Sequence, residues 1–322
     1  MTKMKALATP SYGPISQMTV TELPIPAPGS GQVRVKVIAS AVNPADHKAP
    51  TGEVKFLHGR RFPMVMGYDF SGVIDALGPG VTGLSQGDEV FGFLAYGGST
   101  KQGAYAEFLV TPVTQLALKP KAVSHAMAAA AATPALTALQ GLRDDGKLAS
   151  GGRVLVIGAS GGVGSLAVGI ARKLGAQVDA VCSTHAVEFV RELGADLVID
   201  RKKEDPLVAA KGPYDVILDA AAAHSFSKTR HSLKPGGTYV TTLPSPAFAL
   251  DKLKTLVSAQ SCKMILLKPL PADLELLGKW LTEGLKVPID STIPVREVPA
   301  ALQRMIGGEM KGRIVVEVAT GF

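Results

Sequence analysis

The sequence has few of the residues that hold small secreted folds and metal centres together. Its 322 residues include two cysteines, Cys182 and Cys262, and neither a C-x-x-C nor an H-E-x-x-H pattern occurs. Two cysteines cannot build a disulfide framework, and structural zinc sites take four nitrogen or sulfur ligands held together. We therefore expect neither a disulfide-stabilised secreted domain nor a cysteine-based zinc site.

Long apolar runs and a secretory signal are also lacking. The longest apolar stretch, 126–139, is shorter than the ~20 residues of a membrane-spanning helix, and Thr133-Pro134 interrupts it. Basic residues number 34 against 27 acidic ones, but they are scattered, and no zinc-finger, KH or RNP motif accompanies them. The sequence predicts a soluble, cytoplasmic protein with no membrane span and no nucleic-acid partner. Its net charge of +7 favours anionic ligands such as phosphorylated cofactors.

Apolar material is ample, since hydrophobic residues make up 46% of the chain. At ~150 residues per domain, this length suggests about two domains. Before about residue 125 the chain is rich in glycine turns and short strands, and Gln32–Ala39 alternates polar and apolar side chains as a half-buried strand does. This part predicts a tightly turned β-rich domain.

From about residue 125 onward, helices and strands alternate. Strands are predicted at 153–157, 177–182, 196–199, 215–218 and 237–241, and helices at 125–142, 161–174, 187–193 and 224–233. Such alternation predicts a parallel sheet covered on both faces. The tail, with helices at 272–283 and 299–306 and a strand at 312–318, is expected to rejoin the first domain. The predicted boundaries are 1–124, 125–267 and 268–322.

The turn after the strand 153–157 is the most informative stretch. It reads Gly158-Ala159-Ser160-Gly161-Gly162-Val163-Gly164 and opens a predicted helix. Glycines let a pyrophosphate approach the backbone, and the free N–H groups of a helix start attract the anion. A tight turn without a ligand is the alternative, but the strand-turn-helix context favours a dinucleotide. We expect Ser160, Gly161, Gly162 and Val163 to contact the diphosphate.

The end of the second strand indicates which dinucleotide binds. NAD-binding proteins place an acid at this tip for the ribose 2′-hydroxyl, whereas here the strand ends in Ser183-Thr184-His185 and its one acid, Asp179, lies earlier. Ser183 and Thr184 can donate to a phosphate, and Arg201 can supply positive charge. The sequence therefore predicts NADPH as the cofactor, with an exposed loop cation as the alternative role of Arg201.

Further motifs follow one another in order along nearly the whole chain: Asn43-Pro44-Ala45-Asp46-His47-Lys48, Gly67-Tyr68-Asp69-Phe70-Ser71-Gly72-Val73, Gly87-Asp88-Glu89-Val90, Gly103-Ala104-Tyr105-Ala106-Glu107, Leu193-Gly194-Ala195-Asp196 and Lys311-Gly312-Arg313-Ile314-Val315. With the glycine turn, they resemble the medium-chain dehydrogenase/reductase superfamily, and more narrowly its zinc-free quinone oxidoreductase branch. That branch includes NADPH-dependent alkenal and enone oxidoreductases and the chloroplast-envelope quinone oxidoreductase homologues. The resemblance implies an α/β fold, with a GroES-like β-rich catalytic domain plus a Rossmann doubly wound parallel-sheet domain.

The chain departs from the zinc alcohol dehydrogenases of this superfamily at their metal ligands. Those relatives have a cysteine where Asn43 stands and a Gly-His-Glu motif where Gly67-Tyr68-Asp69 stands. Their lobe with four structural cysteines is missing between Gly92 and Gly103. We therefore expect no metal.

The resemblance implies hydride transfer from NADPH to an α,β-unsaturated carbonyl or a quinone. It makes Lys48, Asn43 and Tyr68 the catalytic candidates, while a solvated lysine, a turn cap and aromatic packing are their respective alternatives. Lys48 is also expected to contact the cofactor, together with Leu243 and Lys311. Asp46 is expected to orient its neighbours. The apolar pocket is expected to draw on Phe56, Leu94, Tyr96, Pro134 and Leu243.

The sequence is also compatible with two other functions and with two assembly states. An NADPH-binding protein with a crystallin-like or RNA-binding role would need no catalysis, and an enoyl thioester reductase would use the same hydride chemistry on a bulkier substrate. The protein is expected to be a monomer or a homodimer.

Overall fold

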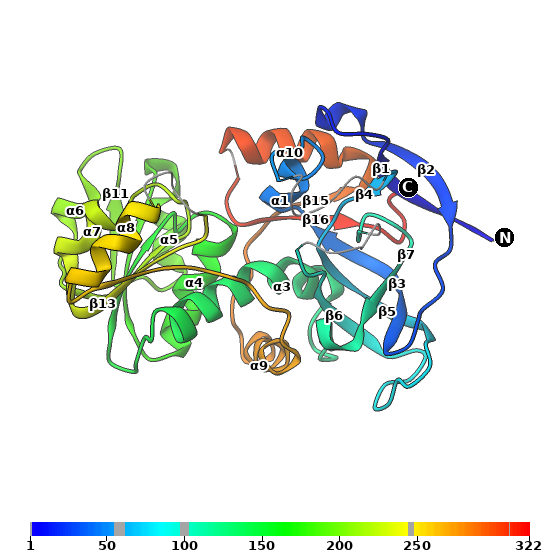
Figure 1. Cartoon of the computed structure of the whole chain (residues 1–322), viewed down its shortest axis with the longest axis horizontal. Helices are drawn as coiled ribbons and strands as arrows, with labels where there is room; N and C mark the ends of the chain where they lie inside the picture. Colours follow the sequence, from blue (N-terminus) through cyan, green and yellow to red (C-terminus); the bar gives the residue numbers. More distant parts are fainter. Residues whose placement is uncertain (1, 55–61, 97–102, 244–247, 309) are drawn as a thin grey trace. The chain divides into compact units, whose positions relative to one another are not determined.

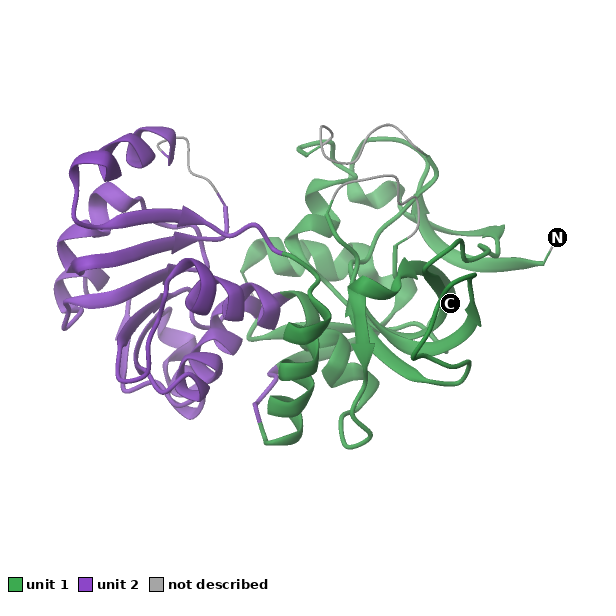
Figure 2. Cartoon of the chain, turned by 60° about the horizontal axis from the view of Figure 1, so that its bottom comes forward, with its two compact units in different colours: residues 1–133, 268–284, 289–322 green, residues 134–267, 285–288 purple. Residues whose placement is uncertain are grey.

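The structure is a computed structural model that describes residues 2–54, 62–96, 103–243, 248–308 and 310–322. The chain divides into two compact units (Figure 2). Unit 1 comprises Met1–Thr133, Lys268–Gly284 and Ile289–Phe322, and unit 2 comprises Pro134–Leu267 and Leu285–Pro288. The chain thus leaves unit 1 and later returns to it. The predicted domain boundaries, 1–124, 125–267 and 268–322, concern units that fold independently, and they stay a prediction.

Unit 1 is built on antiparallel strands. A three-stranded sheet has the order β2-β1-β4, with bounds Thr19–Pro24, Lys3–Thr9 and Met64–Val65. A seven-stranded sheet has the order β15-β16-β3-β5-β6-β8, with β7 also on β3; the bounds are Ile289–Pro294, Arg313–Glu317, Gln32–Ala41, Asp69–Leu77, Glu89–Phe93, Leu116–Leu118 and, for β7, Phe108–Pro112. The predicted alternation in β3 is confirmed, because Val33, Val35 and Val37 are all buried.

The helices of unit 1 are α1 (Pro44–Lys48), α9 (Pro271–Thr282) and α10 (Val298–Gly307), and α3 (His125–Gln140) begins there and ends in unit 2. Helix α10 lies against α1 (Figure 1). No helix is predicted at Pro44–Lys48, but proline at the first helical position and Asp46 accepting from the Asn43 N–H start a helix there.

Unit 2 is a six-stranded parallel sheet in the order β11-β10-β9-β12-β13-β14. The bounds are Leu197–Asp200, Gln177–Cys182, Arg153–Ile157, Tyr214–Asp219, Leu233–Thr241 and Ser261–Met264. Val154 to Ile157 are buried without interruption, as expected of a strand covered on both faces. The order reverses between β9 and β12, and right-handed crossovers on either side of that point place helices on opposite faces. The predicted fold class is confirmed.

The helices of unit 2 are α4 (Gly162–Lys173), α5 (Val187–Glu192), α6 (Pro206–Ala209), α7 (Phe226–Thr229) and α8 (Phe248–Lys254). The predicted helix 224–233 is wrong in its length. It stops at Thr229, whose hydroxyl donates to the carbonyls of Ser225 and Phe226, and Leu233 already belongs to β13. None of the helices in the described part of the chain has the length and apolar character to cross a bilayer.

Candidate functional site

The glycine turn between β9 and α4 has the geometry of a phosphate-binding loop. Gly158 has φ of +82°, a conformation that side chains disfavour. A Cβ on Gly164 would lie 2.1 Å from the Gly158 carbonyl oxygen, so only glycine fits there. A Cβ on Gly161 would meet nothing closer than 3.5 Å. Gly161 is therefore not required by the chain's own packing, and its small size leaves the helix start open.

The start of α4 offers unpaired backbone donors. The N–H groups of Gly162, Val163 and Gly164 find no acceptor within the described chain, because the first turn of a helix leaves its donors free. Ser160, Gly161, Gly162 and Val163 are half-buried, which leaves a ligand access to them. These residues fit a diphosphate, since backbone donors and the positive end of the helix dipole both attract an anion.

Two other loops meet this turn at the same edge of the sheet. The carbonyl of Val181 in β10 accepts from the N–H groups of Gly158 and Ala159 at 3.1 and 2.9 Å. The carbonyl of Cys182 accepts from the N–H of Arg201 at 3.0 Å. The structure therefore brings the predicted cofactor residues Ser183 and Thr184, which follow β10, beside the glycine turn. Arg201 lies one strand further away, beside the end of β10, and Leu243 lies just beyond the carboxyl end of β13 in the same unit.

The side chain of Asp179 is buried and hydrogen-bonded within unit 2. Its carboxylate accepts from the Arg153 guanidinium at 2.7 Å and from the Tyr214 hydroxyl at 2.6 Å, and its side chain is buried. Arg153 also lies over the Tyr214 ring, 5.2 Å from its centroid. An acid held by two partners inside the strand is not available to a ribose.

Asp200, at the end of β11, is an acid that the sequence reasoning missed. Its carboxylate accepts from the Thr184 hydroxyl and from the Lys202 N–H, both at 3.0 Å. The cofactor prediction rests on the tip of the second strand alone. A parallel sheet places the carboxyl ends of neighbouring strands together, so Asp200 at the end of the next strand was the available signal.

In unit 1, a buried polar cluster surrounds Asp69. Its carboxylate accepts from the Arg313 guanidinium at 2.7 Å, the Asn43 side-chain amide at 2.9 Å and the Thr133 N–H at 2.7 Å. The Oδ1 of Asn43 accepts from Arg313 at 3.0 Å, and its Nδ2 also donates to the Ala41 carbonyl at 3.3 Å. The amide of Asn43 therefore holds other protein groups in place, which suits a positioning role.

Asp46 is a second buried acid, from helix α1. It accepts from the Asn43 N–H at 2.7 Å, the Gly67 N–H at 2.9 Å and the Tyr105 hydroxyl at 2.8 Å. Burial raises the pKa of Asp46 to about 7, although these three donors oppose the shift. Asp46 thus links α1 to the segment before β5 and titrates near neutral pH.

The remaining catalytic and cofactor candidates of unit 1 are Lys48, Tyr68 and Lys311, and they differ in burial and in the contacts that they make. Lys48 ends α1, is half-buried, and its ammonium has no partner among the described residues. Tyr68 is buried with its ring centroid 4.7 Å from that of Tyr96, and burial raises the pKa of its hydroxyl far above the ordinary value, so the hydroxyl stays protonated. Lys311 is exposed, and its N–H donates to Asp290.

The expected pocket residues lie partly within the described structure. Phe56 lies outside the described residues. Leu94 and Pro134 are buried, while Tyr96 and Leu243 expose 39% and 44% of their surface. Within the residues that the structure describes, no group of three or more His, Cys, Asp or Glu side chains could hold a metal ion.

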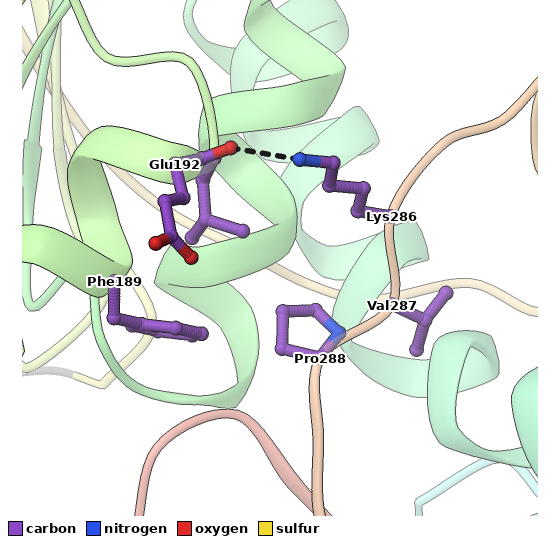
Figure 3. A pocket seen from close by; sticks show the side chains of 6 residues that line it. Phe189, Glu192, Lys286, Val287 and Pro288 are labelled. Carbon is purple, nitrogen blue, oxygen red and sulfur yellow. Dashed lines mark hydrogen bonds between the residues drawn. The ribbon is translucent and has the colours of Figure 1, made fainter.

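A cavity of about 260 Å³ in unit 2 lies away from the glycine turn. It is lined by residues from the end of α5 and from the segment 286–288 (Figure 3): Phe189, Glu192, Leu193, Lys286, Val287 and Pro288. The ammonium of Lys286 donates to the Glu192 carbonyl at 3.0 Å, as a cation at a helix C-terminus does. Helix α5 ends at Glu192, shortly before β11 begins at Leu197. The cavity therefore lies at the edge of the sheet where the strands begin, whereas the glycine turn lies at the opposite edge, where they end.

Comparison with known proteins agrees with both units. Residues 29–121 match the alcohol dehydrogenase GroES-like domain, and residues 193–316 match the family described as zinc-binding dehydrogenase. The chain is 33% identical to the chloroplast envelope quinone oxidoreductase homologue of Arabidopsis thaliana, over 98% of each chain. It belongs to the medium-chain dehydrogenase/reductase superfamily, in the quinone oxidoreductase branch. The resemblance read from the sequence motifs is thereby confirmed.

Other members of the superfamily extend this relationship. The chain is 32% identical to the mitochondrial NAD(P)H oxidoreductase RTN4IP1 of Drosophila melanogaster, over 98% of this chain and 86% of that one. It is 36% identical to the 2-methylene-furan-3-one reductase of Solanum lycopersicum, over 74% of this chain and 62% of that one. The quinone oxidoreductase of Coxiella burnetii superposes with a TM-score of 0.88 at 28% identity, over 98% and 100% of the two chains. Membership of this superfamily supports a nicotinamide cofactor.

Proposed function

We propose that the protein is an NADPH-dependent oxidoreductase that transfers a hydride to α,β-unsaturated carbonyls or to quinones without zinc. The observation that carries this proposal is the glycine turn, where three free backbone donors and a fixed Gly164 suit a dinucleotide diphosphate. The names of the relatives, which include quinone oxidoreductases, an NAD(P)H oxidoreductase and an enone reductase, support the reaction.

The preference for NADPH rests on the charges around the end of β10. Asp179 is held by Arg153 and Tyr214, so it does not repel a 2′-phosphate at the strand tip. Arg201, whose guanidinium has no ion-pair partner among the described residues, is exposed beside that tip. A free cation next to the ribose favours the phosphorylated cofactor.

Bound NADPH supplies the hydride, and the protein orients the acceptor and stabilises the charge that develops on it. When a hydride reaches the β-carbon of an enone, negative charge moves to the carbonyl oxygen. Lys48 is the candidate donor to that oxygen, because its ammonium is unengaged within the described structure. Asn43 and Asp46 hold the segment that carries it, and the protonated hydroxyl of Tyr68 is a second candidate donor.

Independence from zinc rests on the side chains at the positions where the zinc relatives bind the metal. Asn43 and Asp69 are already engaged with Arg313, so their polar atoms point into a protein network. Neutral amide and tyrosine groups are poor substitutes for the cysteine and histidine ligands that zinc prefers.

The experiment is NADPH oxidation by the purified protein, with a short-chain enone, a 1,4-benzoquinone and an enoyl thioester as separate acceptors. Turnover of the enone or the quinone that survives exhaustive chelation, with elemental analysis showing no stoichiometric zinc, supports the proposal. Turnover of the thioester alone would assign a different reductase, and nucleotide binding without any turnover would favour a non-catalytic role. The cytoplasmic location expected from the sequence stays a prediction, tested by fractionation of the source cells.

A further inference from the structure

The end of β11 lies beside the loop expected to meet the adenosine ribose. In the parallel pairing of β10 with β11, Cys182 is the partner of Asp200. The carbonyls of Val181 and Cys182 bind the N–H groups of the glycine turn and of Arg201 respectively. Asp200 therefore stands at the carboxyl edge of the sheet, one strand away from the phosphate turn.

The hydrogen bond between Thr184 and Asp200 determines whether the Thr184 hydroxyl can donate a hydrogen bond to a ligand or only accept one. A threonine hydroxyl has one proton and two lone pairs, and a carboxylate can only accept. The proton of Thr184 therefore points to Asp200 Oδ1 at 3.0 Å, and the lone pairs of its oxygen face outward from an exposed residue. An outward acceptor suits a ribose 2′-hydroxyl, which has a proton to donate. It does not suit a 2′-phosphate, whose oxygens accept.

The charge of Asp200 acts in the same direction. Burial alone would raise the pKa of this carboxyl, but hydrogen bonds from Lys202 N–H and Thr184 and the charges of Lys203 and Arg201 hold it below its ordinary value. Asp200 is thus an anion at neutral pH, in contact with Thr184. A phosphate monoester carries ~1.5 to 2 negative charges at that pH, so the two groups repel each other.

We propose that Thr184 and Asp200 read the 2′ position of the adenosine ribose. Thr184 accepts a hydrogen bond from the 2′-hydroxyl of NADH, and Asp200 limits the gain in affinity that Arg201 and Lys203 give to the 2′-phosphate of NADPH. The protein consequently accepts NADH beside NADPH, with a preference that is set by the negative charge of Asp200 against the positive charges of Arg201 and Lys203. The inference rests on the proposed function for its nicotinamide cofactor, and it adds the pair that governs selectivity.

The roles of Thr184 and Asp200 can be tested by isothermal titration calorimetry, which measures the dissociation constants of two cofactor fragments and requires no catalytic turnover. The ligands are 2′,5′-ADP, which carries the 2′-phosphate, and 5′-AMP, which carries the 2′-hydroxyl. Asp200→Asn keeps an oxygen acceptor for the Lys202 N–H and removes the charge. We expect it to tighten 2′,5′-ADP by about 5- to 10-fold and to change 5′-AMP by less than about twofold. Thr184→Val should weaken 5′-AMP by about 5-fold and leave 2′,5′-ADP unaffected.

Glu204→Gln is the matched control, because it removes one negative charge from the same turn at an exposed side chain with no partner among the described residues. It should leave the ratio of the two dissociation constants unchanged. A second variant, Asp200→Ser, repeats the charge removal with a smaller side chain if the asparagine variant unfolds at a lower temperature than wild type. An unchanged ratio in both Asp200 variants, or a Thr184→Val variant that loses 2′,5′-ADP, overturns the inference.

The same fragments separate this inference from the proposed reaction. If the ratio shifts as expected while no enone or quinone is reduced, the reading of the 2′ position stands and the proposed reaction fails. If NADPH-dependent turnover is found and the ratio does not move, the reaction stands and Thr184 and Asp200 have no part in selectivity.

Discussion

Arg313 at the start of β16 donates to the carboxylate of Asp69 at the start of β5 at 2.7 Å, across 244 residues of sequence. Both side chains are buried, and Asp69 also accepts from Asn43 and from the Thr133 N–H. This ion pair joins the returning tail of the chain to the first half of unit 1. It also holds Asn43, which precedes α1 and the candidate Lys48.

Replacing Arg313 with methionine should destabilise unit 1 strongly. The change leaves the Asp69 carboxylate buried with no opposite charge, and breaking one partner of a buried pair costs about 3–5 kcal/mol. The measurement is denaturant unfolding of Arg313→Met against wild type. The control is Lys3→Met, which breaks a pair with Glu22 whose side chains are each 62% exposed; exposed pairs contribute up to ~1 kcal/mol. Equal losses in the two variants would contradict the argument.

The local pattern of the sequence predicts the sheet of unit 2 well. Strands 153–157 and 177–182 agree with β9 and β10 in both bounds. β9 shows the unbroken apolar run, 154–157, that is typical of a strand buried on two faces, whereas Asp179 interrupts the apolar run of β10. The glycine turn is equally local, and its spacing alone predicts the free donors at the start of α4.

Relationships between distant segments could not be predicted in this way. No pattern near Asp69 indicates that Arg313 is its partner, since the pairing depends on how β16 adds to β3. Asp200 was missed because its meaning depends on the neighbouring strand. The predicted helix 224–233 is too long because side-chain periodicity does not indicate that α7 ends at Thr229, or that the short turn Arg230–Ser232 leads directly into β13 at Leu233.

Adding a methyl group at Gly164 should damage the phosphate turn, whereas adding one at Gly161 should not unfold it. The Cβ of Gly164→Ala would sit 2.1 Å from a backbone oxygen, and overpacking of this kind costs about 1–3 kcal/mol. The Cβ of Gly161→Ala has ordinary contacts within the protein, so that variant should keep wild-type thermal stability. Thermal unfolding measures the stability of the two variants, and titration with NADPH measures their affinity for the cofactor. Wild-type stability and NADPH affinity in Gly164→Ala would contradict the role of that glycine.

Stability should rise as the pH falls through neutrality, because of Asp46. Its pKa is about 7 in the folded protein against an ordinary value of 3.8, so between these values the native state holds a proton that the unfolded chain has lost. The stabilisation is complete below the unfolded value and is lost as pH rises through about 7, at roughly 1.4 kcal/mol per pKa unit. The measurement is the free energy of unfolding at pH 8, 7, 6 and 5 for wild type and Asp46→Asn.

The difference between those two proteins isolates Asp46 from the other titrating groups. An asparagine cannot ionise, so the free energy of the variant should rise less than that of wild type over this range. The variant also places an amide N–H near the donors of Asn43 and Gly67, which lowers its stability at every pH. Parallel curves for the two proteins would show that Asp46 does not titrate in this window.

Replacing Lys48 with methionine should slow the reduction of an enone while leaving the dinucleotide bound. If its ammonium donates to the developing oxyanion, the loss falls on kcat, and removing one such donor typically costs about 10²- to 10³-fold. Stopped-flow rates of NADPH oxidation at saturating enone, together with the Kd for NADPH, check this. Lys36→Met, at an exposed lysine of β3, is the matched control and should behave as wild type. Lys48→Arg keeps a cation at this position and should recover part of the rate. Tyr68→Phe removes the hydroxyl of the second candidate donor and is measured in the same assay. A Lys48→Met variant with normal kcat and weakened NADPH binding would instead assign Lys48 to the cofactor.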